Sequence, residues 1–209
     1  MMSVDPIDSG DPVDPGDSVR ASLQRVLLRW TDAVREHSGA LPSIEHDPDW
    51  PSPCIVDGPD ANAYDRGRVH WRPCPRDTQA DFSGIERALE EPLHADIRSF
   101  YGSFYSDPLP MRAADGPLTL LQVWSDRDFD RLLENVIGHA ANQRRVRAPL
   151  TVFIATTDED DLNLCVCNAS GKVVLERPGA APLREIAPSL SVFLDGLEPV
   201  LPVGDDDTL

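Results

Sequence analysis

The most constraining feature of the chain is the segment 124–156, which joins an amphipathic helix pattern to a buried strand pattern. Ser125 suits the N-cap position, and Asp128 stands three residues later, where a capping box places its acid. Apolar residues then recur at helical spacing: Phe129, Leu132, Leu133, Val136, Ile137 and Ala140. Pro149 ends this pattern, and residues 150–156 are rich in β-branched side chains. We therefore expect a capped helix that leads directly into an interior strand.

Further helices are expected on similar evidence. Residues 19–34 carry an apolar stripe at helical spacing, and Gly39 suits the end of that helix because glycine adopts a left-handed backbone readily. Ser83 and Glu86 match a capping box at the start of a second helix. Pro92 is expected to open a short helical piece, and a last helix is expected over residues 188–197.

Short apolar runs between turn residues predict the strands of a sheet. They are residues 54–56, 69–71, 118–123, 150–156, 162–166 and 173–176. The segments 41–53 and 107–110 are rich in proline or aspartate and are expected to be loops. Since most of these strands are neighbours along the chain, we expect a single α+β domain with a mostly antiparallel sheet and helices packed on one side.

Negative charge is spread over the whole chain, whose formal net charge is −17. Residues 1–18 repeat aspartate, proline and glycine and are expected to form a disordered acidic arm. Residues 202–209 are expected to form an acidic tail, which leaves 19–201 as the folded domain. The acids of the two ends do not account for the total, because residues 20–204 keep a net charge of −9.

An acidic surface of this kind repels nucleic acid and anionic lipid and attracts basic protein segments, so the expected partner is cationic. A second explanation stays open. Lys172 is the only lysine, and the other basic residues are arginines, a pattern that also fits a salt-adapted or compositionally biased proteome in which acidity serves solubility. Acids gathered on one concave face would favour recognition.

The sequence predicts a cytosolic location. No apolar run approaches the roughly 18 residues that a membrane-spanning helix needs. The N-terminal segment carries acids where a signal peptide carries a basic and then an apolar region. Four cysteines are few for this length and are expected to be reduced thiols.

Catalytic and metal-binding patterns find little support in the chain. No two histidines stand four residues apart, and His139 is expected to be satisfied by nearby backbone or by the helix terminus. Cys165 and Cys167 have no second pair at ligand spacing, so we expect them to pack as small apolar residues. The acidic turn 158–161 has Asn163 where a calcium loop requires glycine. We expect a protein that is not an enzyme, with no cofactor and no metal.

Several short segments occur in one characteristic order. They are Ser52-Pro53-Cys54-Ile55, Trp71-x-Pro73, Glu86-Arg87-Ala88, Leu118-Thr119-Leu120-Leu121-Gln122-x-Trp124, Ile137-Gly138-His139, Gln143-Arg144-Arg145, Thr151-x-Phe153-Ile154-Ala155-Thr156 and Cys167-Asn168-x-Ser170-Gly171. In this order they resemble the bacterial Syd family of SecY-interacting proteins, over about residues 20–201. The family's fold is placed with the Smi/Knr-like superfamily, which includes many toxin-immunity proteins.

The resemblance implies a protein attached loosely to the cytoplasmic side of the inner membrane through SecY, a subunit of the protein-translocation channel. It would bind the basic cytosolic loops of SecY in an acidic groove, insert nothing into the lipid, and monitor or restrain incompletely assembled translocase. The acids expected to line the groove stand beside the matched segments: Asp81, Glu86, Glu90, Glu91, Asp107 and Glu134. The alternative is an immunity protein that neutralises a basic toxin such as a nuclease, which would use the same electrostatics.

Overall fold

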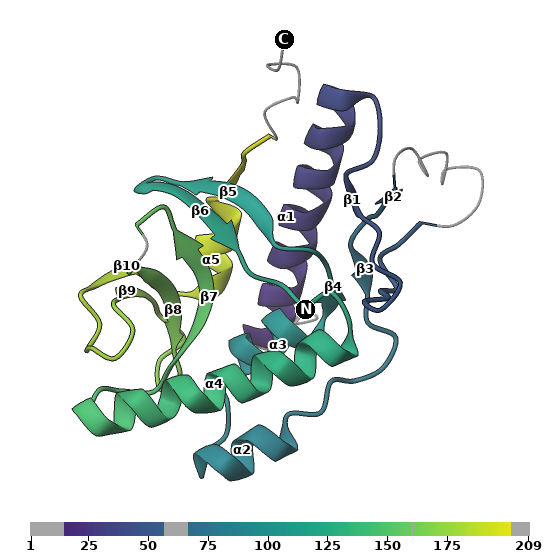
Figure 1. Cartoon of the computed structure of the whole chain (residues 1–209). Coiled ribbons are helices and arrows are strands. Elements are labelled where there is room, and N and C mark those ends of the chain that lie inside the picture. Colours follow the sequence, from purple (N-terminus) through teal and green to yellow (C-terminus); the bar gives the residue numbers. More distant parts are fainter. Residues whose placement is uncertain (1–14, 57–66, 160, 202–209) are drawn as a thin grey trace, which may run out of the picture.

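The main element of the fold is a seven-stranded antiparallel sheet with the strand order β10-β9-β8-β7-β6-β5-β11. The computed structural model describes residues 15–56, 67–159 and 161–201. The strands of this sheet are β5 (Leu109–Ala113), β6 (Gly116–Leu120), β7 (Thr151–Thr157), β8 (Asn163–Cys167), β9 (Val173–Glu176), β10 (Arg184–Ala187) and β11 (Glu198–Pro199). The sheet is strongly curled (Figure 1).

Five helices surround this sheet in the described part of the chain. They are α1 (Pro15–Ser38), α2 (Ser83–Leu89), α3 (Ala95–Gly102), α4 (Asp126–Val146) and α5 (Leu190–Asp195). Helix α1 stands beside the sheet with α5 next to it, and α4 runs across the lower ends of the strands (Figure 1). The predicted α+β class with a mostly antiparallel sheet is confirmed.

The long helix α4 and the strand β7 form where the sequence pattern predicts them. Ser125 is the N-cap, and its hydroxyl accepts a hydrogen bond from the Asp128 backbone N–H at 3.3 Å. The Asp128 carboxylate accepts from the Trp124 backbone N–H at 3.0 Å, one residue before the capping-box position. The helix ends at Arg147, whose left-handed backbone (φ 56°) turns the chain before Pro149.

Helix α1 supplies a long apolar face to the core. The residues predicted for this stripe are all buried: Val19, Leu23, Val26, Leu27, Trp30 and Val34. Gly39 follows the helix with φ 75°, so its predicted role as a helix end is confirmed. The helix begins at Pro15, which places residues 15–18 of the predicted arm in α1. The rest of that arm, and the predicted tail 202–209, lie outside the described residues.

Four short strands form two small sheets beside the main one, and here the sequence prediction needs correction. Strand β1 (Ser43–Glu45) lies inside the predicted loop 41–53 and pairs with β2 (Arg68–His70). The predicted pairing of 54–56 with 69–71 is reduced to one bridge between Ile55 and Trp71. Strand β3 (Cys74–Pro75) pairs with β4 (Phe104–Tyr105). Each of these strands pairs with a strand that is distant in the sequence, so no local sequence pattern predicts the pairing.

The predicted loop 107–110 is also wrong in part, because β5 begins at Leu109 and forms a hairpin with β6. Strands β10 and β11 were not predicted. Both are edge strands: β10 adds to β9 with a register shift, and β11 pairs through only two residues. Edge strands are short and half-solvated, which weakens the alternation that sequence analysis depends on.

The N-terminal caps of α2 and α3 differ from those that the sequence predicts. Ser83 is the first residue of α2, and the N-cap position belongs to Phe82, which makes no side-chain cap bond. The chain enters α2 through a turn in which the Asp81 carboxylate accepts from the Ser83 backbone N–H at 2.8 Å. Glu86 therefore serves no capping box and accepts from the Leu93 N–H. Helix α3 begins at Ala95 because His94 caps it.

Candidate partner-binding groove

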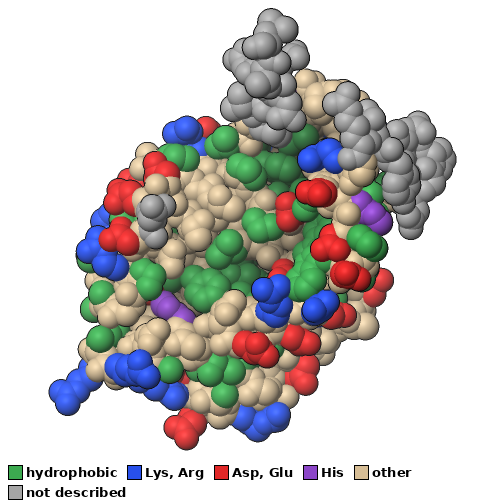
Figure 2. Space-filling model, in the orientation of Figure 1, with side chains coloured by type: hydrophobic (Ala, Val, Ile, Leu, Met, Phe, Trp, Pro, Cys, Tyr) green, Lys and Arg blue, Asp and Glu red, His purple; other side chains and the backbone are tan. Residues whose placement is uncertain are grey.

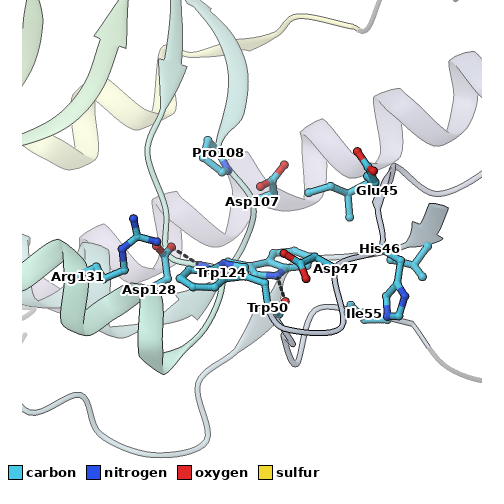
Figure 3. Close-up of a pocket in the computed structure, with 12 residues that line it drawn as sticks. Glu45, His46, Asp47, Trp50, Ile55, Asp107, Pro108, Trp124, Asp128 and Arg131 are labelled. Carbon is cyan, nitrogen blue, oxygen red and sulfur yellow. Dashed lines mark hydrogen bonds between the residues drawn. The ribbon is translucent and has the colours of Figure 1, made fainter. Parts of the chain in front are cut away.

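A groove opens where three segments distant in sequence meet: β1 and the loop after it, the turn between β4 and β5, and the first turn of α4. Its volume is about 360 Å³. Figure 3 shows Glu45 and Asp47 on one side, Asp107 and Pro108 on another, and Asp128 with Arg131 on α4. Figure 2 shows acidic side chains, with basic ones among them, beside a hollow on this face, and further acids on the rest of the face in view.

The described lining residues of this groove are dominated by negative charge. Four of them are acids, Glu45, Asp47, Asp107 and Asp128, and one, Arg131, is an arginine. Asp107 is half-buried, and the loss of solvent together with the Asp128 carboxylate raises its pKa to about 6. Burial is the larger of these two causes, and both make the charged form of Asp107 less favourable. A nearby cation would favour the charged form again.

The floor of the groove is apolar and aromatic. Ile44, Ile55 and Val69 line it together with Trp50 and Trp124. Trp124 packs edge-to-face on Trp71, with ring centroids 5.7 Å apart. Lysine and arginine bury their methylene stems on such surfaces while their charged ends reach acids at the rim.

Hydrogen bonds hold the walls of the groove in place. The Trp124 indole N–H donates to the Trp50 carbonyl at 3.2 Å, and the Ser52 hydroxyl donates to the Trp124 carbonyl at 2.5 Å. The Asp47 carboxylate closes a turn by accepting from the Asp49 N–H at 2.9 Å. The segment after β1 is thus tied directly to the residue that precedes the N-cap of α4.

Two arginines of α4 cover the indole of Trp50. The guanidinium of Arg127 lies 4.6 Å from the ring centroid and that of Arg131 lies 5.0 Å from it. These cation–π contacts hold both guanidinium groups against an indole that lines the groove. Among the described lining residues, the four acids still outnumber the one arginine, Arg131.

The six acids predicted for a groove do not lie together. Asp107 lines the groove described above, whereas Asp81 and Glu86 lie in a second hollow formed by α1, α2 and α3. Glu90 and Glu91 follow α2, and Glu134 is exposed on α4. Within the described residues, Asp107 alone belongs to both the predicted set and this groove. A role in binding for the other five stays a prediction.

The second hollow, of about 710 Å³, differs in its charge. Its described lining includes the acids Asp81 and Glu86 and also the bases Arg20 and Arg98. Arg98 forms an ion pair with Glu86 at 3.6 Å. The backbone N–H of Ser83 stabilises the Asp81 carboxylate and lowers its pKa. Positive and negative charges balance there, so nothing in this hollow selects a cation.

Sequence reasoning missed Glu45, Asp47 and Asp128 as groove residues. Asp128 was interpreted as a helix-cap acid, and Glu45 and Asp47 lay in a segment predicted to be a loop. Glu45 and Asp47 come from one side of the groove and Asp128 from another, and they meet because Trp124 packs beside the β1–β2 pair. The density of aspartate in 45–49 was the available signal.

A buried polar cluster lies between α4 and the sheet. His139 Nε2 is 3.0 Å from Glu176 Oε1, and the Thr151 hydroxyl donates to the same carboxylate at 2.7 Å. Burial and the Glu176 carboxylate raise the pKa of the Cys165 thiol. His139, Cys165 and Glu176 bring donor atoms of zinc-binding type within 4.8 Å of one another. These contacts form an internal hydrogen-bond network that fastens α4 to β7, β8 and β9.

This cluster shows that the predicted partners of His139 are wrong, and that the predicted burial holds for Cys165 but only in part for Cys167. His139 contacts the side chains of Thr151 and Glu176 instead of the expected backbone or helix-terminus partner. Cys165 is buried as expected, while Cys167 is half-exposed.

No helix in residues 15–56, 67–159 and 161–201 combines the length and apolar character of a membrane span.

Comparison with known proteins gives a consistent result. The family model described as "Syd protein (SUKH-2)" matches residues 20–199. Protein Syd of Pseudoalteromonas atlantica is 41% identical over 182 residues, which cover 87% of this chain and 96% of the relative. Protein Syd of Yersinia pseudotuberculosis is 40% identical over 185 residues, which cover 88% of this chain and 98% of the relative. Protein Syd of Pectobacterium carotovorum is 37% identical over 182 residues, with 87% and 97% covered.

Proposed function

Because the chain belongs to the Syd family, we propose that it is a non-enzymatic binding protein whose acidic groove engages basic cytosolic loops of the translocon subunit SecY. The observation that carries this proposal is the gathering of Glu45, Asp47, Asp107 and Asp128 over an aromatic floor. In this function the protein monitors or restrains incompletely assembled translocase. It acts at the cytoplasmic side of the inner membrane and is attached there by SecY.

The raised pKa of Asp107 supports a cationic ligand in particular. Its carboxylate is costly at neutral pH because it is half-buried beside Asp128. A lysine or arginine of the partner placed between these two acids removes that repulsion and adds charge-assisted hydrogen bonds. Groups that destabilise the free protein and are relieved by a ligand are typical of binding sites.

The form of the groove supports an extended basic segment of the partner. The volume of about 360 Å³ accommodates a few side chains of such a segment and is too small for a folded domain. The exposed acids Glu45 and Asp47 at the rim steer the segment by long-range attraction, and the apolar floor packs its aliphatic parts.

The charge of the chain supports attachment through a basic protein segment such as a SecY loop, with no lipid insertion. The net charge of −17 opposes contact with the anionic cytoplasmic leaflet, so affinity for the membrane has to come from a basic protein segment. Binding of this kind weakens steeply with salt, because most of the attraction is electrostatic.

The test is capture of SecY from detergent-solubilised inner membranes by the immobilised full chain, at low and at high salt. The expected result is recovery of SecY at low salt that fades as the salt rises. Protein-free anionic vesicles form the matched control and are expected not to bind. Absence of SecY at low salt, or equal binding to the vesicles, would overturn the proposal.

A further inference from the structure

Two cysteine side chains lie in contact beside the groove wall. The Sγ atoms of Cys54 and Cys74 are 3.9 Å apart. Cys54 is 1% exposed, whereas Cys74, in β3, is half-exposed. Their segments are already joined by a hydrogen bond from the Arg72 N–H to the Cys54 carbonyl at 3.0 Å. The backbone thus holds the two thiols side by side.

We propose that Cys54 and Cys74 are a thiol–disulfide exchange site, which a small-molecule disulfide of the glutathione class oxidises to an internal disulfide. A disulfide needs its sulfur atoms about 2.05 Å apart. Closing the gap from 3.9 Å takes a movement of about 2 Å, to which rotation about the two Cα–Cβ bonds contributes. This inference does not depend on the proposed function.

The two thiols differ in exposure and in pKa, and these differences indicate which thiol attacks and which one resolves the mixed disulfide. The hydrogen bond with Cys54 lowers the pKa of Cys74 and outweighs burial and the Asp77 carboxylate, which raise it; the nearby Arg72 adds to the lowering. The same hydrogen bond, together with burial, raises the pKa of Cys54. Cys74 is thus both more accessible and more readily ionised, which are the two properties of an attacking thiol. Cys54 is the resolving thiol.

The exchange balances in two steps. The Cys74 thiolate attacks one sulfur of the small disulfide, forms a mixed disulfide and releases one small thiolate. Cys54 then gives its proton to the released thiolate and attacks the Cys74 sulfur. This attack expels the second small thiolate, which takes up the proton that Cys74 lost on ionising. The net result is one protein disulfide and two small thiols from one protein dithiol and one small disulfide.

The other two cysteines provide an internal control. Cys165 and Cys167 stand two residues apart on one strand, β8, where alternate residues are separated by about 6.6 Å and their side chains run parallel. This arrangement is unfavourable for a disulfide. Cys165 is also fully buried beside Glu176.

A bond between Cys54 and Cys74 would act on the groove wall. Ile55, the residue after Cys54, lines the groove. The hydroxyl of Ser52, two residues before Cys54, donates a hydrogen bond to the Trp124 carbonyl. Oxidation would fasten this segment covalently to β3. The inference concerns the thiol pair itself, and its test needs no partner.

The test equilibrates the full chain in a series of reduced and oxidised glutathione, quenches with acid, alkylates free thiols and maps peptides by mass spectrometry. The expected product is a linked peptide pair containing Cys54 and Cys74, with an intact mass lower by two hydrogen atoms. The variant Cys74→Ser is expected to lose this product, and the control Cys167→Ser is expected to keep it. Circular dichroism of each variant checks that the fold is kept.

Two results would overturn the proposal. One is free thiols at both positions in the most oxidising buffer. The other is a mixed disulfide with glutathione at Cys74 that persists, because the resolving step by Cys54 would then have failed.

Discussion

The two hollows of this molecule both contain acids, but the surroundings shift the pKa of those acids in opposite directions. In the hollow formed by α1, α2 and α3, Arg98 pairs with Glu86 and a backbone N–H stabilises Asp81, whose pKa is lowered. In the groove, Asp107 lies beside Asp128 and its pKa is raised to about 6. The difference shows that a count of acids does not identify a binding surface. The surroundings of each acid have to be compared as well.

The largest expected effect comes from the aromatic side chains that line the two hollows. Trp124→Ala is expected to lower the free energy of unfolding by about 3–5 kcal/mol, because it removes a buried ring that packs on Trp71. Phe82→Ala, the matched change in the other hollow, removes a ring that packs edge-to-face on Phe129 and is expected to cost a similar amount. Urea denaturation followed by tryptophan fluorescence and circular dichroism measures both.

Binding distinguishes these two variants. Under conditions in which both remain folded, Trp124→Ala is expected to reduce binding of a basic peptide, since the floor of the groove is lost. Phe82→Ala is expected to bind as the unaltered protein does. Equal loss of binding in both variants would contradict the separation of the two hollows.

A smaller effect on stability is expected when Asp107 of the groove or Asp81 of the second hollow is replaced by asparagine, and its sign is opposite at the two positions. The folded-state pKa of Asp107 lies above its usual value, so its ionisation opposes folding as the pH rises through about 6. Asp107→Asn is expected to stabilise the protein by about 1–2 kcal/mol at pH 8, after allowance for partial solvent screening, and by nothing near pH 3.5.

Asp81→Asn is expected to do the reverse. The pKa of Asp81 is lowered by the Ser83 N–H, so its carboxylate stabilises the fold above its unfolded pKa, and that contribution is lost as the pH falls. The loss in the variant is therefore present at pH 8. Thermal unfolding at pH 8 and pH 3.5 tests both signs, and a destabilised Asp107→Asn at pH 8 would show that the groove is not strained by its charge.

The pH dependence of binding should report the same carboxylate. Raising the pH from 5 to 7 ionises Asp107 and is expected to strengthen binding of a basic peptide by about threefold, as one added partly screened charge does. Asp107→Asn is expected to remove most of this dependence. Titration calorimetry in buffers of different ionisation enthalpy also measures the coupled proton release, and a flat profile in the unaltered protein would contradict the assignment.

The smallest effect is expected for the paired acid of the second hollow. Glu86→Gln removes the ion pair with Arg98 but keeps an oxygen that accepts from the Leu93 N–H. The expected loss of stability is about 0.5 kcal/mol, measured by urea denaturation, with no change in peptide binding. A tenfold loss of binding in this variant would move the site to the second hollow.

The sequence was sufficient for the parts of the fold that local pattern determines. The helices α1 and α4, the strand β7 and the hairpin of β8 and β9 lie where periodicity and caps predict them, and the family resemblance is confirmed. Periodicity succeeded there because each element buries one continuous face. The capping box at Ser83 failed because Asp81, two residues earlier, forms the competing bond.

The groove was less accessible to sequence analysis. Its acids come from residues 45–47, from Asp107 and from Asp128, and their proximity depends on the packing of Trp124 against the β1–β2 region. Proximity to family segments selected Asp107 correctly as a lining residue, and it also selected acids such as Glu134 that lie elsewhere. Which acids share a face is a property of tertiary structure, and one sequence does not contain that information locally.

The most direct test of the cationic groove compares two charge reversals of equal size. The pair Glu45→Lys with Asp47→Lys changes exposed acids of the groove, and the pair Glu90→Lys with Glu134→Lys changes exposed acids outside it. Calorimetric titration with a basic SecY loop peptide at low salt is predicted to show at least a roughly tenfold weaker affinity for the first pair and less than about a twofold change for the second. Equal weakening by both pairs would show that the peptide responds only to net charge, and would contradict the groove.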